Sequence, residues 1–186
     1  MVVDTILFGD CRETLKEFDG KARTCVTSPP YYGLRNYGNE EDQIGQEQTP
    51  EEYIQNLVEV FRSVRDVLTD DGTLWVNIGD SYYNYRPGKG QALPKQTVSK
   101  TKQDLPDKCA KRGNKLEGLK EKDLIGIPWM LAFALRADGW YLRQDIIWHK
   151  PNPMPESVKD RCTKSHEYIF LLSKNRKYYY NNEAIK

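Results

Sequence analysis

Thr27-Ser28-Pro29-Pro30-Tyr31 directly follows Ala22 to Val26, a stretch with the composition of a buried strand. The two prolines end that strand, because proline has no backbone N–H, and their fixed φ angles make the bend stiff. The bend therefore offers carbonyl oxygens and the Ser28 hydroxyl as hydrogen-bond acceptors, while Tyr31 offers a flat ring for stacking. This pattern favours binding of an aromatic ring that carries an amino group. A Pro-Pro step alone is more often a plain turn or a polyproline ligand, so the flanking sequence must decide.

Outward from this bend, strand patterns alternate with helix patterns. Thr49-Pro50-Glu51-Glu52 is a capping box with proline at the first helical position, and apolar residues then repeat at helical spacing from Tyr53 to Leu68. The other predicted elements are strands at Thr5–Phe8, Leu74–Ile78, Trp140–Trp148, His166–Ser173 and Lys177–Tyr180, and helices at Arg12–Phe18 and Asp123–Arg136. The alternation predicts a three-layer α/β domain, with the last two strands forming an antiparallel hairpin at a sheet edge.

The chain has 186 residues, which predicts one domain, and its formal net charge is only +1. The charge is unevenly distributed, because residues 84–122 contain 11 Lys or Arg and 4 Asp or Glu. This basic insert has scattered Gly and Pro and no periodicity, which indicates a loop. Such a block favours contact with phosphates, and Lys95, Lys100 and Lys102 are candidate DNA-binding residues. A solvated loop with no binding role is the alternative.

Several classes of protein are unlike this sequence. Its four cysteines form no Cys-x-x-Cys pair and it has only two histidines, so a metal site is not expected. Free thiols are typical of a reducing cytoplasm, which is the predicted compartment. The amino terminus does not resemble a signal peptide, and no apolar run is long enough to span a membrane.

Five segments in this order resemble the amino-methylating DNA methyltransferases of the β arrangement, in which the catalytic half precedes the cofactor-binding half. They are Ile6–Cys11, Thr27–Tyr31, Gly72–Tyr82, Gly139–Pro153 and Ser165–Lys174. The resemblance implies a Rossmann-like methyltransferase sheet and transfer of a methyl group from S-adenosylmethionine to an exocyclic amine in double-stranded DNA, as in restriction-modification systems. Serine at position 28 is more typical of cytosine-N4 enzymes, and adenine-N6 methylation is the alternative. No Pro-Cys step is present, so methylation of a ring carbon is not expected.

The resemblance also implies roles for individual residues. Ser28, Pro29, Pro30 and Tyr31 form the catalytic motif: the Ser28 hydroxyl and the Pro29 carbonyl accept the two N–H bonds of the amine, and Tyr31 stacks on the base. The base has to be flipped out of the duplex to reach such a pocket. The implied cofactor-binding residues are Asp10, Cys11, Thr27 and Asp80, and the implied DNA-binding residues are Trp148, His149 and Lys150. For Asp10 and Asp80 the alternative is capping of a turn or helix, and for Trp148 it is core packing.

The sequence departs from the family pattern near its end. The glycine-rich cofactor loop expected after the last hairpin is not found, nor is the segment that usually reads the target sequence. In the family fold, two central strands come from that part and lie between the strand ending at Asp10 and the strand ending at Ser28. The resemblance therefore implies an incomplete sheet with open edges, which favours pairing with a second polypeptide or a second copy. A noncatalytic DNA-binding remnant is an alternative of another class.

Overall fold

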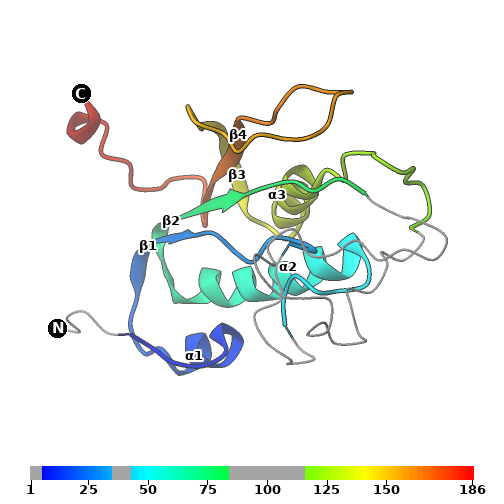
Figure 1. Cartoon of the computed structure of the whole chain (residues 1–186). Coiled ribbons are helices and arrows are strands. Elements are labelled where there is room, and N and C mark those ends of the chain that lie inside the picture. Colours follow the sequence, from blue (N-terminus) through cyan, green and yellow to red (C-terminus); the bar gives the residue numbers. More distant parts are fainter. Residues whose placement is uncertain (1–5, 35–42, 84–115) are drawn as a thin grey trace.

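The computed structural model describes residues 6–34, 43–83 and 116–186, which form a mixed α/β fold (Figure 1). Its helices are α1 (Cys11–Glu17), α2 (Pro50–Val67) and α3 (Ile127–Ala137), followed by a short 3-10 helix (Glu183–Ile185). Its strands are β1 (Ala22–Thr27), β2 (Leu68–Ile78), β3 (Tyr141–His149) and β4 (His166–Ser173). No helix among the described residues is long and apolar enough to cross a membrane.

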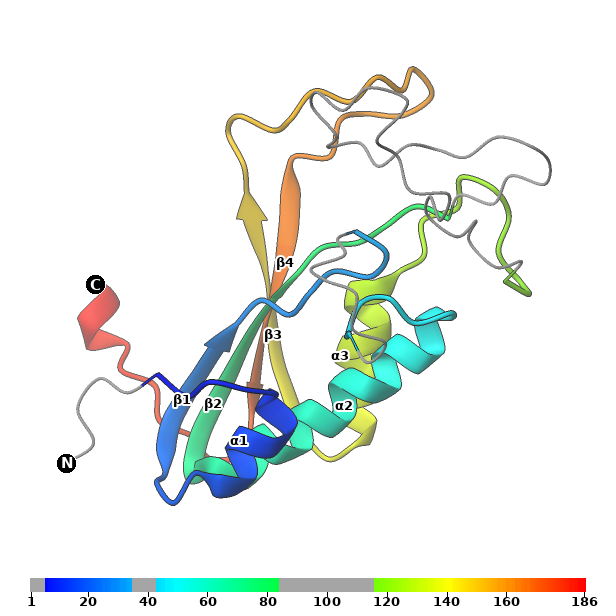
Figure 2. The same ribbon diagram turned by 60° about the horizontal axis from the view of Figure 1, so that its bottom comes forward.

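The four strands form one sheet in the order β1-β2-β4-β3. β1 runs parallel to β2, whereas β4 is antiparallel to both of its neighbours, β2 and β3. Figure 2 shows α2 and α3 packed along the same side of this sheet. Because β1 and β2 are parallel, their carboxyl ends meet at one edge of the sheet, where ligands of open α/β sheets gather.

The core lies between this side of the sheet and the helices. α2 begins at Thr49, whose side chain caps the helix while Glu52 bonds back to the Thr49 backbone, so the predicted capping box is present. Below it, a stripe of apolar α2 side chains packs on the α-facing side chains of β2 and β4. Each such side chain contributes about 1.5–3 kcal/mol when fully buried. The largest fully buried ones are Tyr53, Phe61, Phe170, Leu57, Leu68, Leu74, Ile78, Ile127, Leu131, Leu135, Leu172 and Val76.

Two predicted strands are wrong. Residues 6–8 form no strand, and Ile6, Leu7 and Phe8 are exposed, because no neighbouring strand among the described residues bonds to them. Residues 177–180 form no strand either, since both edges of β4 are already bonded to β2 and β3. An antiparallel hairpin does lie at a sheet edge, but β3 and β4 form it.

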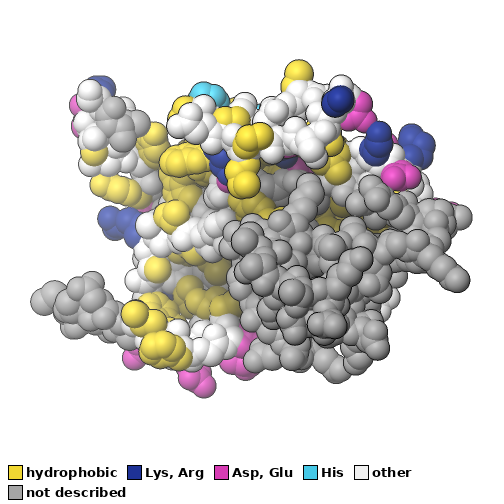
Figure 3. Space-filling view, in the orientation of Figure 1, with side chains coloured by type: hydrophobic (Ala, Val, Ile, Leu, Met, Phe, Trp, Pro, Cys, Tyr) yellow, Lys and Arg dark blue, Asp and Glu magenta, His cyan; other side chains and the backbone are white. Residues whose placement is uncertain are grey.

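β1 is bonded to β2 on one side, and no other described strand pairs with it. The sheet face opposite α2 and α3 carries exposed apolar side chains, of which Val26 is 77% exposed. Figure 3 shows hydrophobic side chains gathered over the β1 and β2 region. In the part of the chain that the structure describes, the sheet and the helices thus give two of the three predicted layers.

Candidate active site

The predicted catalytic motif lies at the carboxyl edge of the sheet, directly after β1. Ser28 is exposed, and its hydroxyl donates to Asn77 Oδ1 of β2 at 3.4 Å. The Tyr31 hydroxyl donates to the same oxygen at 3.0 Å. The parallel pairing of β1 with β2 brings these groups together, because it places the last residues of both strands side by side. Two hydroxyl groups and one amide therefore form the centre of the site.

Asn77 was not predicted from the sequence as a site residue. It is the only polar side chain in Leu74–Ile78, a strand segment that is otherwise apolar. Its Nδ2 donates to the backbone carbonyl of Tyr168 in β4 at 3.4 Å, which fixes the orientation of the amide. The sequence did contain a signal for Asn77 as a site residue, because it is a single polar residue near the carboxyl end of an apolar strand.

The Tyr31 ring lies against the backbone of Gly79. A Cβ atom at position 79 would come within 2.5 Å of Tyr31 Cε2. Burial raises the pKa of Tyr31 to about 12. A hydrogen bond with Ser28 lowers this pKa, and the nearby Glu167 carboxylate raises it. The phenol therefore stays neutral and can donate a hydrogen bond at neutral pH. The half-buried ring is held by the Gly79 backbone and by the hydrogen bond of its hydroxyl to Asn77. Stacking of Tyr31 on a base stays a prediction.

We expect Gly79→Ala to lower the rate constant of methyl transfer by about tenfold, because the added methyl group displaces the Tyr31 ring. The strain is local, so the melting temperature should change little. The control is Ala184→Gly, which lies in the carboxyl-terminal turn and leaves the site untouched. Gly118→Ala cannot serve as the control, because Gly118 has a positive φ that would strain an alanine. Single-turnover kinetics give the rate, and an unchanged rate for Gly79→Ala would show that the ring position is unimportant.

The two prolines are anchored differently from Ser28. Pro29 is buried, and no donor among the described residues contacts its carbonyl oxygen. The Pro30 carbonyl accepts a 2.7 Å hydrogen bond from the hydroxyl of Tyr53, a fully buried residue of α2. The bend is therefore tied to the core from behind, while Ser28 faces solvent.

Trp148, near the end of β3, lies close to this centre. Together with Asn77 and Ile169 it lines an open hollow of about 280 Å³ on the sheet face opposite the helices. Its side chain is 56% exposed, so the core-packing alternative does not describe it. The structure thus places a predicted DNA-binding side chain beside Asn77, the residue that holds Ser28 and Tyr31.

His149 and Lys150 follow Trp148 at the end of the β3–β4 hairpin. His149 is exposed and pairs with His166 across the hairpin. Lys150 Nζ forms an ion pair with Glu167, a second site residue that the sequence analysis missed. Because Glu167 also contributes to the raised pKa of Tyr31, this ion pair borders the site.

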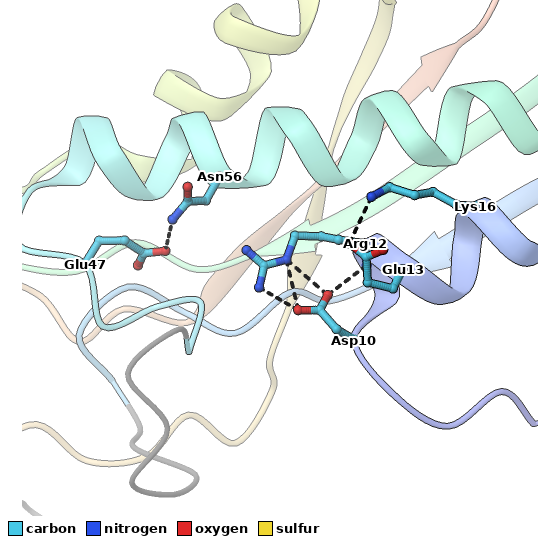
Figure 4. Close-up of polar contacts among 6 residues, drawn as sticks. All are labelled: Asp10, Arg12, Glu13, Lys16, Glu47 and Asn56. Atoms are coloured by element: carbon cyan, nitrogen blue, oxygen red, sulfur yellow. Dashed lines mark hydrogen bonds and ion pairs between the residues drawn. The ribbon is translucent and has the colours of Figure 1, made fainter.

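Asp10 and Cys11 lie at the start of α1. The Asp10 carboxylate caps this helix by accepting from the Arg12 backbone N–H at 2.8 Å, and it also binds the Arg12 guanidinium (Figure 4). The side-chain and backbone hydrogen bonds from Arg12 hold the pKa of Asp10 below its usual value. Asp10 is exposed, and Cys11 beside it is exposed as well, so both can be reached by a ligand. Their cofactor role stays a prediction.

Figure 4 also shows how the loop before α2 is attached to that helix. Asn56 Nδ2 of α2 donates to Glu47 Oε1 at 2.9 Å, and the other Glu47 oxygen accepts from the Gly45 backbone N–H at 2.8 Å. Gly45 in turn lies against Pro30 and Tyr31. These contacts support the catalytic motif from the side of the loop.

Thr27 and Asp80, the other predicted cofactor residues, lie at the ends of neighbouring strands. Thr27 is the last residue of β1 and pairs with Val76. The Asp80 carboxylate accepts from the backbone N–H groups of Ser81, Gly126 and Ile127 at 2.9–3.0 Å. It therefore caps the amino terminus of α3, whose own N-cap residue, Gly126, has no side chain to do so.

We expect Asp80→Ala to reduce the free energy of unfolding by about 1–2 kcal/mol, because it leaves the first N–H groups of α3 without their carboxylate acceptor. Asp80→Asn should recover part of this loss, since its amide oxygen still accepts. Urea unfolding measures both. Glu117→Ala, at an exposed acidic residue in the chain leading to α3, is the control. No destabilisation by Asp80→Ala would contradict the capping role.

The predicted DNA-binding residues Lys95, Lys100 and Lys102 lie outside the described residues. Of the basic insert, only residues 116–122 are described. There Lys122 forms a 2.7 Å ion pair with Asp160 on the loop between β3 and β4. Both side chains are solvent-exposed, so this pair adds little stability.

Comparison with known proteins gives one family. Residues 22–186 match a family model described as DNA methylase. Type II methyltransferase M.SmaI of Serratia marcescens is 54% identical over 187 residues, which cover 97% of this chain and 59% of the relative. Type II methyltransferase M.Cfr9I of Citrobacter freundii is 52% identical over 183 residues, which cover 98% and 58%. The chain thus spans less than two thirds of the length of these relatives.

Solved structures share the fold at low sequence identity. PvuII DNA methyltransferase (cytosine-N4-specific) has a TM-score of 0.60 and 16% identity, and the match covers 95% of this chain and 51% of that chain. A putative DNA modification methylase of Thermus thermophilus, complexed with S-adenosyl-L-methionine, has a TM-score of 0.56 and 21% identity, with 95% and 55% covered. These likenesses establish the arrangement of helices and strands.

Proposed function

This chain belongs to the DNA methylase family of N6- and N4-methyltransferases, and we propose that it transfers a methyl group to the exocyclic N4 amine of cytosine in DNA. The observation that carries the proposal is the position of Ser28. Its hydroxyl is exposed at the carboxyl edge of β1, beside a stiff Pro-Pro bend in which Pro29 is buried and Pro30 is half-buried. Ser28 to Tyr31 form the predicted catalytic motif, and the exposure of Ser28 leaves this motif open to a substrate.

The chemistry needs acceptors rather than donors. The lone pair of an exocyclic amine is delocalised into the ring, so the nitrogen is a weak nucleophile. Ser28 Oγ and the Pro29 carbonyl oxygen are suited to accept its two N–H bonds and to turn the remaining lone pair toward the methyl donor. Positioning and electrostatic stabilisation then supply most of the rate enhancement.

S-adenosylmethionine is the proposed methyl donor, and it supplies a methyl group on a sulfonium sulfur. The Asp10 carboxylate is a proposed cofactor contact because it is exposed, although Arg12 already donates to both of its oxygens. Asp80 is less exposed, and its Oδ1 accepts from three backbone N–H groups. Thr27 and Cys11 stay in the proposed cofactor set by their places beside Ser28 and Asp10.

The substrate base has to leave the double helix before it reaches Ser28, which costs a few kcal/mol. We propose that the Trp148 ring, which is exposed and lines the hollow with Asn77, recovers part of this cost by stacking on the extruded base. His149 and Lys150 follow at the rim, and Lys95, Lys100 and Lys102 are proposed phosphate contacts.

Identification of the methylated nucleoside tests the proposal. Plasmid DNA is incubated with the protein and S-adenosylmethionine, digested to nucleosides and analysed by mass spectrometry. We expect N4-methylcytosine, because serine at position 28 is more typical of cytosine-N4 enzymes. N6-methyladenine would replace our assignment with the alternative, and no modified base with intact DNA binding would favour a noncatalytic DNA-binding protein.

Three further predictions accompany this proposal. The chain is expected to be a single domain with the basic insert at 84–122, and with DNA as its substrate the cytoplasm is the expected compartment. A second polypeptide or second copy that pairs along β1 is also proposed, because that strand is bonded on one side only among the described residues. Mass photometry across a dilution series measures whether the protein self-associates.

A further inference from the structure

Asn77 holds two hydroxyl protons with one oxygen. Its amide is oriented by the bond from Nδ2 to the Tyr168 carbonyl, which turns Oδ1 toward the catalytic motif. There Oδ1 accepts from Tyr31 at 3.0 Å and from Ser28 at 3.4 Å. An amide oxygen has two lone pairs, so both are used.

The direction of the Ser28 hydrogen bond matters for the chemistry. A serine hydroxyl has one proton and can act toward a substrate either as a donor or as an acceptor. If Ser28 donated to the target amine, it would engage the lone pair that has to attack the methyl group. Because its proton points to Asn77, the lone pairs of Ser28 Oγ remain for the N–H bonds of the amine.

We propose that Asn77 is a positioning residue that commits Ser28 to act as a hydrogen-bond acceptor toward the target amine. The inference rests on the proposed function, since it concerns the same site. It differs from a role in sheet stability, because Asn77 lies on the sheet face opposite the core helices and lines the open hollow with Trp148.

The test compares Asn77→Leu with Asn77→Asp. Leucine removes the acceptor, so we expect the single-turnover rate constant to fall roughly 10- to 30-fold while the KM for DNA stays within about twofold. Aspartate keeps the acceptor but, when ionised near neutral pH, loses the donor to the Tyr168 carbonyl, so its rate should lie between those of the wild type and Asn77→Leu. Gln144→Leu makes a similar amide-to-leucine change at an exposed position of β3 and should leave the rate unchanged.

Two readouts separate positioning from a merely structural role. In Asn77→Asp, the neutral carboxyl group reproduces both features of the amide, because its carbonyl oxygen accepts the two hydroxyl protons and its O–H donates to the Tyr168 carbonyl. The ionised carboxylate lacks that donor, so the rate relative to wild type should rise as the pH is lowered through the pKa of the new carboxyl group. This readout applies even if Asn77→Leu does not fold. In a Ser28→Ala background, Asn77→Leu should cost much less than it does in the wild-type protein, because the group that it positions is already absent.

An active wild-type protein whose rate Asn77→Leu leaves unchanged would overturn the inference alone. The inference would also be overturned if Asn77→Leu lowered the rate by the same factor in the Ser28→Ala background as in the wild-type protein. A ratio of the Asn77→Asp rate to the wild-type rate that does not change with pH would overturn it as well. A wild-type protein that transfers no methyl group to any base would overturn the proposed function, and the inference with it.

Discussion

Replacing Ser28 with alanine should lower the rate constant of methyl transfer by about 10²- to 10³-fold, the size of effect seen when one preorganised hydrogen-bonding group is removed from an active site. The substitution removes one of the two acceptors for the target amine. It leaves the Pro-Pro bend and its bond to Tyr53 intact, and Ser28 is exposed, so no cavity forms in the core. Single-turnover transfer of a labelled methyl group measures the loss.

The control for this change is Ser63→Ala, at a half-buried serine of α2 whose hydroxyl bonds within its own helix. That variant should keep the wild-type rate. DNA affinity of Ser28→Ala, measured by gel shift, should stay within about twofold, because the lost contact acts mainly in the transition state. A Ser28→Ala protein with full activity would remove the basis of the proposed function.

Trp148→Ala should have the second-largest effect, a decrease of up to about 10²-fold in kcat/KM for DNA. Stacking of a base on an aromatic side chain contributes roughly 1–3 kcal/mol, and the 56% exposed indole ring lies beside Asn77 in the hollow. The melting temperature should change little, since the ring is not part of the core. Steady-state kinetics on a duplex oligonucleotide measure the change.

Ile147→Ala provides a matched comparison, because Ile147 is the preceding residue of β3 and is 53% exposed. Its side chain points to the other face of the sheet, so its kinetics should resemble those of the wild type. A second comparison uses DNA with a mismatch at the target cytosine, whose base is already partly extruded. If stacking stabilises the flipped base, Trp148→Ala should lose less on this substrate.

Local sequence patterns predicted much of the fold. The α2 start was found because Thr49 and Glu52 bond to each other within a single turn, and β2 and β4 were found because many of their residues are apolar and buried. β1 is a strand as predicted, but the expectation that it is buried is wrong, because none of its residues is buried among the described residues. The β4 partner was misjudged. Which edge of a strand is free depends on the whole sheet, and β2 and β3 occupy both edges of β4.

The site shows the same division. Ser28 to Tyr31 was identified as a short contiguous motif, whereas Asn77 is 49 residues from Ser28 and meets it only through the β1–β2 pairing. Asp80 shows the same limit. Capping was one of the two roles expected for it, but its carboxylate accepts from backbone N–H groups 46 and 47 residues further on, so the helix that it caps could not be identified from the local sequence.

The hydrogen bond from Tyr53 to the Pro30 carbonyl has a consequence for protein engineering. Tyr53 is fully buried in the first turn of the helix that builds the core, so the same side chain packs the interior and holds the reaction geometry. Selection for heat tolerance would therefore find this turn hard to improve, because repacking around Tyr53 also shifts the catalytic motif. We expect heat-tolerant variants to accumulate their substitutions elsewhere, on surface positions of α3 and in the carboxyl-terminal segment.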